Sequence, residues 1–420
     1  MYNHTLLDNG IRIVTERMPH VRSVSVGFWV DVGSRDEHDL NNGSAHFAEH
    51  MFFKGTRQRT AEQIAIELDG MGGLSNAFTS KENTCFYAKV LDHHLPNIVE
   101  LLLDLFLNSS FEQEEVERER QVIIQEMGMV EDMPEEYLHD LFGGLFWGNH
   151  PLRNTVLGSR EVVANMSSQK ISHYVSHTYA PQRILVSASG NVDHQEFVGL
   201  LAGPLERLPL RTGPSLRQIP VIPAPQQTVF QKDLEQVHMM LGVPGLAVIA
   251  EERYQLLLLN IILGGNMSSR LFQTIREKHG LAYAVYSFVA PYADCGCLGI
   301  YVGVDRETVN LTLGMLAQEL QKIRTQAIAD EELRNAKEYA KSELFLAAEN
   351  SEARMIRLAQ NELYFGRDIP LAEVVDQLDL VTSDDLLALS NTLLDQEGVT
   401  AVAYGPVTEN DVDWESITSL

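Results

Sequence analysis

The order of predicted strands and helices in the first half of this chain returns in the second half. In the first half, a strand over residues 23–32 precedes a helix at residues 43–51, and a strand pair and longer helices follow. The strand at residues 236–243 and the helix at 251–263 begin the same order again. Apolar residues recur with period 2 in the strands and with period 3.6 in the helices. The repeat restricts the fold to two related α/β halves.

A segment rich in proline and glycine separates the two halves. Between Pro204 and Pro225 lie five further prolines or glycines, and the apolar residues there show little periodicity. Such a composition is typical of an interdomain linker. The sequence therefore predicts an N-terminal domain over residues 1–205, a linker over 206–225 and a C-terminal domain over 226–420. A chain of 420 residues, 45% of them hydrophobic, is long enough for two cores.

Charge and apolar runs exclude several classes of protein. A formal net charge of −26 argues against nucleic-acid binding, because phosphates would be repelled. The sequence contains no apolar run of about 18 residues and therefore predicts no membrane-spanning helix. The first ten residues lack a basic segment followed by an apolar run, so we expect a cytoplasmic protein. The three cysteines, Cys85, Cys295 and Cys297, do not form a disulfide framework, and we expect ordinary thiols in strands.

The helix predicted at residues 43–51 carries a metal-binding pattern. His46, Glu49 and His50 occupy positions i, i+3 and i+4 and therefore share one helix face. Neutral imidazoles are suitable zinc ligands, and a carboxylate beside them can act as a base. This H-x-x-E-H order is the inverse of the H-E-x-x-H zinc motif. The alternative is a chance grouping on a solvated helix, and a metal site needs a third ligand.

A second acidic helix offers candidates for that ligand. The segment from Glu112 to about Val130 reads as an amphipathic helix, and Glu119 and Glu126 lie seven residues apart on one of its faces. Glu126 follows His50 by 76 residues. The second half has no histidines at the positions that correspond to the H-x-x-E-H helix. Only the N-terminal half can therefore bind metal in this way.

The H-x-x-E-H motif, followed at this interval by the segment Glu117–Glu126, resembles the pitrilysin and mitochondrial processing peptidase family, and the likeness extends over nearly the whole chain. The resemblance implies an α+β fold of two homologous halves, each an antiparallel-rich sheet packed with helices. It also implies that His46, His50 and Glu126 bind zinc and that Glu49 is the general base. Glu119 would be an assisting acid close to the ligands.

Two further segments match the same family. Asn76 and Ala77 lie in a segment that resembles the family's active-site edge strand, on which an extended peptide can be held by backbone hydrogen bonds. Arg276 and Tyr283, seven residues apart, resemble the family's substrate-binding pair from the C-terminal half. Donors of this kind would hold the substrate backbone or an oxyanion. The alternative is a surface arginine and an ordinary strand tyrosine.

The resemblance implies a zinc endopeptidase that cleaves unfolded or extended peptides, with one zinc ion per chain. Manganese or cobalt would fit the same ligands. The chain resembles the short bacterial members and the catalytic processing subunit, which form clam-like dimers. A homodimer is therefore expected, and a heterodimer stays open. Two alternatives remain: a structural or assembly subunit without turnover, and a peptidase that needs a partner subunit. The intact motif, with Glu49 present, favours the enzyme.

Overall fold

The computed structural model describes residues 2–210, 217–394 and 398–418. The chain divides into two compact units, and each combines segments from distant parts of the sequence. Unit 1 comprises Met1–Met129, Asn154–Gln218 and Leu346–Asp368. Unit 2 comprises Val130–Arg153, Ile219–Phe345 and Ile369–Leu420. In the part of the chain that the structure describes, no helix is both long and apolar enough to cross a membrane.

Unit 1 contains a six-stranded sheet with the order β1-β2-β6-β3-β5-β4. Only β2 and β6 pair in parallel among these described strands. The strands are β1 (Tyr2–Leu6), β2 (Arg12–Arg17), β3 (Ser23–Val30), β4 (Leu74–Thr79), β5 (Thr84–Leu91) and β6 (Ile184–Gly190). Strand β4 is at one edge of the sheet, so one side of its backbone is not paired with a strand of this sheet.

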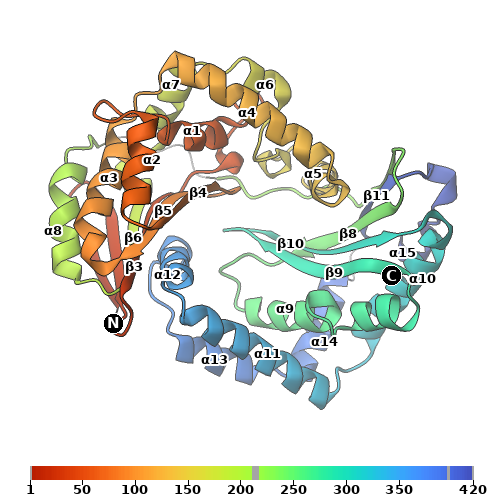
Figure 1. The fold of residues 1–420 in the computed structure, drawn as a ribbon. Coiled ribbons are helices and arrows are strands. Elements are labelled where there is room, and N and C mark those ends of the chain that lie inside the picture. Colours follow the sequence, from red (N-terminus) through yellow and green to blue (C-terminus); the bar gives the residue numbers. More distant parts are fainter. Residues whose placement is uncertain (1, 211–216, 395–397, 419–420) are drawn as a thin grey trace. The chain divides into compact units, whose positions relative to one another are not determined.

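Helices cover both faces of the first sheet (Figure 1). One face packs against α1, α3 and α8, and the other packs against α12. Val24, Val26 and Phe28 of β3 contribute to the first core, whereas Trp29 belongs to the second. The helices of unit 1 are α1 (Ser44–Phe52), α2 (Ala61–Gly70), α3 (Leu95–Asn108), α4 (Gln113–Glu131), α6 (Arg160–Ala164), α7 (Ser168–Thr178), α8 (His194–Leu205) and α12 (Ser351–Phe365).

Unit 2 contains a five-stranded sheet with the order β7-β11-β8-β10-β9. Its strands are β7 (Gln227–Gln231), β8 (Val237–Gly245), β9 (Ala282–Pro291), β10 (Gly296–Val304) and β11 (Thr400–Gly405). Helices α9, α10 and α14 cover one face, and α5 covers the other. The helices of unit 2 are α5 (Pro134–Phe146), α9 (Arg253–Asn260), α10 (Val309–Thr325), α11 (Asp330–Ala348), α13 (Leu371–Leu380), α14 (Ser383–Leu394) and α15 (Glu415–Thr418).

The two sheets repeat one topology, which confirms the predicted fold of two homologous halves. Strands β2, β6, β3, β5 and β4 of unit 1 correspond in order to β7, β11, β8, β10 and β9 of unit 2, and the parallel pair falls at the same place. Helix α9 follows β8 as α1 follows β3, and α9 contains no histidine. Strand β1, which the sequence reading did not include, extends only the first sheet.

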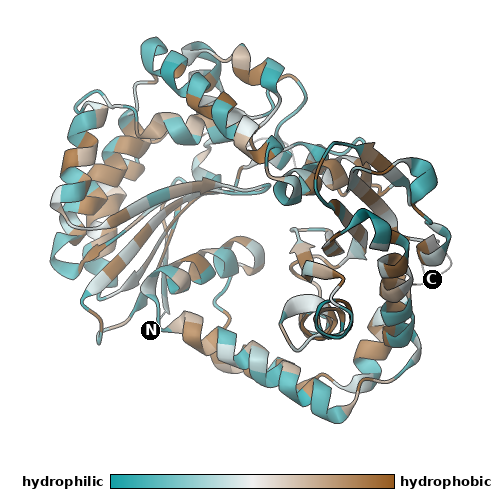
Figure 2. Cartoon of the chain, turned by 45° about the vertical axis from the view of Figure 1, so that its right-hand side comes forward, coloured by the Kyte–Doolittle hydropathy of each residue, from teal (hydrophilic) through white to brown (hydrophobic). Residues whose placement is uncertain are grey.

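Two helices are exchanged between the sequence halves. Helix α5 lies in the first half of the chain but packs on β8 and β11 of unit 2. Helix α12 lies in the second half but packs on β2, β3 and β6 of unit 1. Both helices have an apolar side that contacts hydrophobic strand residues. Figure 2 shows hydrophobic residues, coloured brown, along the strands. Each unit therefore needs a helix from the other half of the sequence to cover its sheet.

Most predicted elements are present within a few residues of their expected bounds. Thr60 caps α2, because its side chain accepts a hydrogen bond from the backbone N–H of Gln63. The prediction that all three cysteines lie in strands is wrong for Cys295. Cys85 and Cys297 are buried in β5 and β10, whereas Cys295 lies in the turn between β9 and β10. All three thiols are free.

Candidate metal centre

Helix α1, which carries the H-x-x-E-H motif, begins at a glycine that cannot cap it with a side chain. Gly43 has a φ of 94° and lies so close to Leu157 that a Cβ atom would be 2.8 Å from its carbonyl oxygen. Glu37 caps the helix instead. Its carboxylate accepts hydrogen bonds from the N–H groups of Gly43 and Ala45, at 2.7 and 2.6 Å, and from Nδ2 of Asn42 at 3.1 Å. A buried carboxyl group at this position accepts hydrogen bonds from helix N–H groups that Gly43 has no side chain to satisfy.

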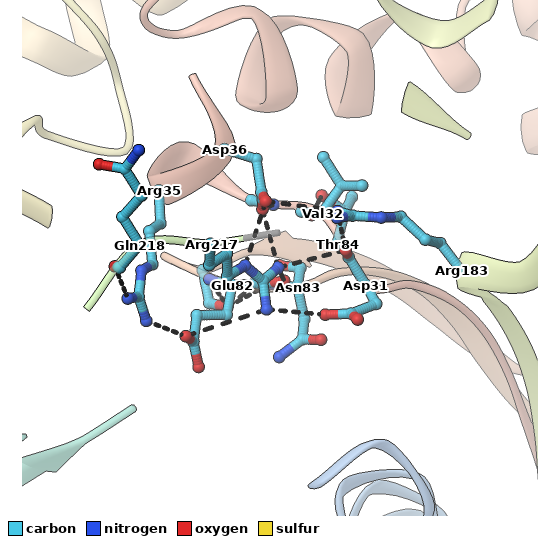
Figure 3. Close-up of polar contacts among 12 residues, drawn as sticks. Asp31, Val32, Arg35, Asp36, Glu82, Asn83, Thr84, Arg183, Arg217 and Gln218 are labelled. Carbon is cyan, nitrogen blue, oxygen red and sulfur yellow. Dashed lines mark hydrogen bonds and ion pairs between the residues drawn. The ribbon is translucent and has the colours of Figure 1, made fainter. Parts of the chain in front are cut away.

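The segment that leads into α1 is held by a cluster of charged side chains (Figure 3). Arg35 donates to Glu82 at 2.6 Å, and both side chains are almost fully buried. Arg217, near the end of the predicted linker, donates to both carboxylate oxygens of Asp36, at 3.1 and 2.8 Å. Arg217 also forms an ion pair with Asp31 at 2.9 Å. These pairs connect the start of the motif segment to the β4–β5 turn and to the linker.

The side chains of His46 and His50 on α1 and of Glu126 on α4 lie close together. Nε2 of His46 and Nε2 of His50 each lie 3.7 Å from Oε2 of Glu126 on α4. One ligand atom from each of the three residues lies within 4.8 Å of the others. The helix spacing brings the two imidazoles together, with ring centroids 4.6 Å apart. The structure thus joins the motif to the glutamate 76 positions further along.

This arrangement fits a zinc ion. Two ligands of a tetrahedral zinc, each about 2.1 Å from the metal, lie about 3.4 Å apart, close to the separations seen here. Burial, together with the neighbouring His50, lowers the pKa of His46 to about 3. A neutral imidazole has a lone pair free for a metal. Two imidazoles and one carboxylate also form a three-ligand donor set typical of catalytic zinc.

Glu119 supports the centre from behind His50. Its Oε2 atom lies 3.0 Å from Nδ1 of His50, and its Oε1 atom lies 2.7 Å from Nζ of Lys54. Burial opposes the charge on Glu119, but hydrogen bonds from His50 and Lys54 hold the pKa of Glu119 below its usual range. An ionised Glu119 fixes the proton of His50 on Nδ1 and leaves Nε2 free for a metal. Lys54 has no counterpart in the sequence prediction.

Glu49 lies on the same helix face but is held differently. Its Oε2 atom accepts a hydrogen bond of 2.6 Å from Oγ1 of Thr79, the last residue of β4. Burial is the largest effect on Glu49 and raises the pKa of its carboxyl group. Glu49 is not part of the convergent ligand set. The Glu49 carboxylate lies close to His50 and Glu126 without belonging to that set, and its role as a base stays a prediction.

The predicted substrate-binding residues occur in both units. Asn76 and Ala77 lie on the edge strand β4 of unit 1, and Asn76 is exposed. Arg276 and Tyr283 belong to unit 2. The guanidinium group of Arg276 lies 4.8 Å from the ring centroid of Tyr283, and Tyr283 is 80% exposed. The structure thus brings these two residues together, and their role in binding stays a prediction.

Sequence reasoning gave no role to Thr79, Lys54 or Glu37. Thr79 lies in the predicted edge strand, but nothing in that strand shows which side chain faces Glu49. Lys54 follows His50 by four positions, a spacing that also occurs on solvated helices. For Glu37, a signal did exist: a helix preceded by glycine needs its cap from elsewhere, and Glu37 is a nearby upstream acid.

Comparison with known proteins agrees with this geometry. The domain described as insulinase (peptidase family M16) matches residues 12–160, and the peptidase M16 inactive domain matches residues 165–339. An uncharacterized zinc protease of Bacillus subtilis is 38% identical over 93% of this chain and 95% of its own. One from Streptomyces coelicolor is 37% identical over 96% of this chain and 90% of its own.

A solved structure has the same fold. A protease from Helicobacter pylori superposes with a TM-score of 0.90 at 23% identity, over 97% of this chain and 99% of its own. That likeness supports the fold. The matched domains cover residues 12–160 and 165–339, and the two zinc-protease relatives cover 93% and 96% of this sequence at 38% and 37% identity. This chain belongs to the insulinase family of peptidases, family M16.

Proposed function

We propose that this protein is a zinc-dependent endopeptidase that cleaves extended or unfolded peptides. The observation that carries the proposal is the convergence of His46, His50 and Glu126, with the Glu49 carboxylate on the same face of α1. Relatives over nearly the whole chain are named zinc proteases, which supports the metal and the reaction class. His46, His50 and Glu126 would hold one zinc ion per chain.

The residues around the centre would have different roles in peptide hydrolysis. When bound, zinc would acidify a water molecule and polarise the scissile carbonyl group. Glu49 accepts the proton of the attacking water and passes it to the nitrogen of the leaving amine. Glu119 keeps the His50 ring oriented through Nδ1. Each step uses a side chain whose position is fixed by a hydrogen bond.

The substrate class follows from the edge strand. A peptide in extended conformation can pair with the free side of β4, near Asn76 and Ala77, and gain backbone hydrogen bonds there. A folded protein cannot offer such a segment without local unfolding. We also assign Arg276 and Tyr283 a part in substrate binding. Replacement by Ala and Phe, respectively, is then expected to raise KM or lower kcat while the zinc content stays unchanged.

Metal analysis and peptide cleavage together test the proposal. Purified protein is expected to contain about one zinc per chain, and H46A is expected to lose it. E49Q is expected to keep zinc and to lose cleavage of unstructured peptides by a factor of about 100 or more. E62Q, at an exposed acid in the first turn of α2, is the matched control. Zinc-loaded protein that cleaves no member of a broad peptide library would instead support a structural subunit or a requirement for a partner.

A further inference from the structure

The carboxylate of Glu49 is held by a side chain of the edge strand. The hydroxyl group of Thr79 donates to Oε2 of Glu49 at 2.6 Å. Among the described residues, no other hydrogen bond to this carboxylate is found. Because one oxygen is held by Thr79, the position of the other oxygen is also restricted. Thr79 thus fixes the direction in which the second oxygen can accept a proton.

Thr79 is itself rigidly placed. It pairs with Thr84 across the β4–β5 ladder and is followed by a tight turn, in which Ser80 donates to the carbonyl oxygen of Asn83 at 2.8 Å. The backbone N–H of Ser34 in turn donates to the carbonyl oxygen of Ser80 at 3.1 Å. The segment before α1 therefore anchors the turn that carries Thr79. Backbone hydrogen bonds therefore connect the segment before α1, the helix of Glu49, to the end of β4, the strand of Thr79.

We propose that Thr79 is a positioning residue, which orients the Glu49 carboxylate for proton transfer and couples that orientation to the peptide-binding strand. This inference rests on the proposed peptidase function. Misplacement of a catalytic group by about 1 Å can lower the rate by about 100-fold. The zinc ligands do not contact Thr79 in any hydrogen bond or ion pair found among the described residues. The loss should therefore fall on turnover and not on metal binding.

The test compares T79V, which keeps the shape but lacks the donor, with T79S, which keeps the donor. T79V is expected to lower kcat by about 10- to 100-fold, with KM within about twofold and an unchanged zinc content. T79S is expected to stay within about threefold of the wild type. T178V is the matched control, because the Thr178 hydroxyl donates within its own helix α7, to the carbonyl oxygen of Tyr174 at 2.7 Å.

A second readout does not depend on activity. In crystals of the metal-free T79V protein, the Glu49 carboxylate is expected to leave its wild-type position, whereas in T79S it should remain. The inference is overturned if T79V keeps its kcat, if T79S loses as much as T79V, or if Glu49 does not move in T79V. A wild-type protein that cleaves no peptide would refute the proposed function instead, and the crystal comparison would still decide the role of Thr79.

Discussion

Glu119 bridges His50 and Lys54: one of its oxygens lies 3.0 Å from Nδ1 of the histidine and the other 2.7 Å from Nζ of the lysine. A carboxylate in this position raises the basicity of a metal-bound imidazole. E119Q is expected to weaken zinc binding by about 10- to 100-fold, measured by competition with a chromogenic chelator. E114Q, at an exposed acid on the same helix, should bind zinc like the wild type. Equal affinities for E119Q and E114Q would contradict this role.

Removal of zinc from this site should lower the unfolding free energy of the protein. Zinc that binds only the folded state adds RT ln(1 + [Zn]/Kd), about 2.7 kcal/mol when free zinc is 100 times Kd. Excess chelator is therefore expected to lower the Tm of the wild type, measured by differential scanning calorimetry. H46A should have the lower Tm from the start and should not respond to chelator. An equal chelator effect on both proteins would place the bound metal elsewhere.

The buried cap Glu37 predicts a pH dependence of stability. Burial raises the pKa of Glu37 to about 8, although three hydrogen-bond donors oppose this shift. Between the unfolded value and about 8, the folded state holds one more proton than the unfolded state. This group's contribution to stability is therefore full below the unfolded value and falls as the pH rises through about 8. Wild type and E37Q should thus differ less in unfolding free energy at pH 8.5 than at pH 5.5.

The experiment is urea unfolding at several pH values between 5 and 9. E37Q lacks the titration, and E62Q, which changes an exposed acid, should keep the wild-type profile. Parallel profiles for wild type and E37Q would show that Glu37 does not change its protonation in this range. A lower stability of E37Q at every pH would still report the lost helix cap.

Substitutions in helix α12, which is far from the H-x-x-E-H motif in sequence, are expected to lower the unfolding free energy. Met355 is fully buried in the cluster that includes Val14, Trp29 and Leu185 of the first sheet. A Cβ atom at Gly27 would lie 2.6 Å from Sδ of Met355, so the helix packs tightly on β3. M355A is expected to cost about 2–5 kcal/mol of unfolding free energy, and M355L less than about 1.5 kcal/mol. Urea unfolding followed by tryptophan fluorescence, to which Trp29, Trp147 and Trp414 contribute, measures both losses, and equal losses would contradict tight packing.

The sequence predicted the local parts of the centre well. Positions i, i+3 and i+4 determine which side chains share a helix face, so His46, Glu49 and His50 could be placed together from spacing alone. Glu126 required the family resemblance, because two residues 76 positions apart have no local relation. The repeated order of elements also predicted two related α/β halves. These predictions depend on periodicity, which short segments of sequence contain.

Long-range contacts could not be predicted in the same way. The apolar side of α12 shows that the helix is buried but not which sheet it covers. The contact between Thr79 and Glu49 depends on how the edge strand lies beside α1. Arg217 lies in a segment whose composition indicated a linker, yet its side chain is largely buried among acids of unit 1. In each case, tertiary packing determines the partner.

The exchange of α5 and α12 affects how this protein can be made. The three convergent side chains, His46, His50 and Glu126, are all encoded before residue 130, but the sheet of unit 1 lacks one of its covering layers until Phe365 has left the ribosome. A gene divided at the linker would encode two products, and each would carry a helix that the other needs. The two halves of this sequence are therefore duplicates in topology, but during synthesis they depend on one another.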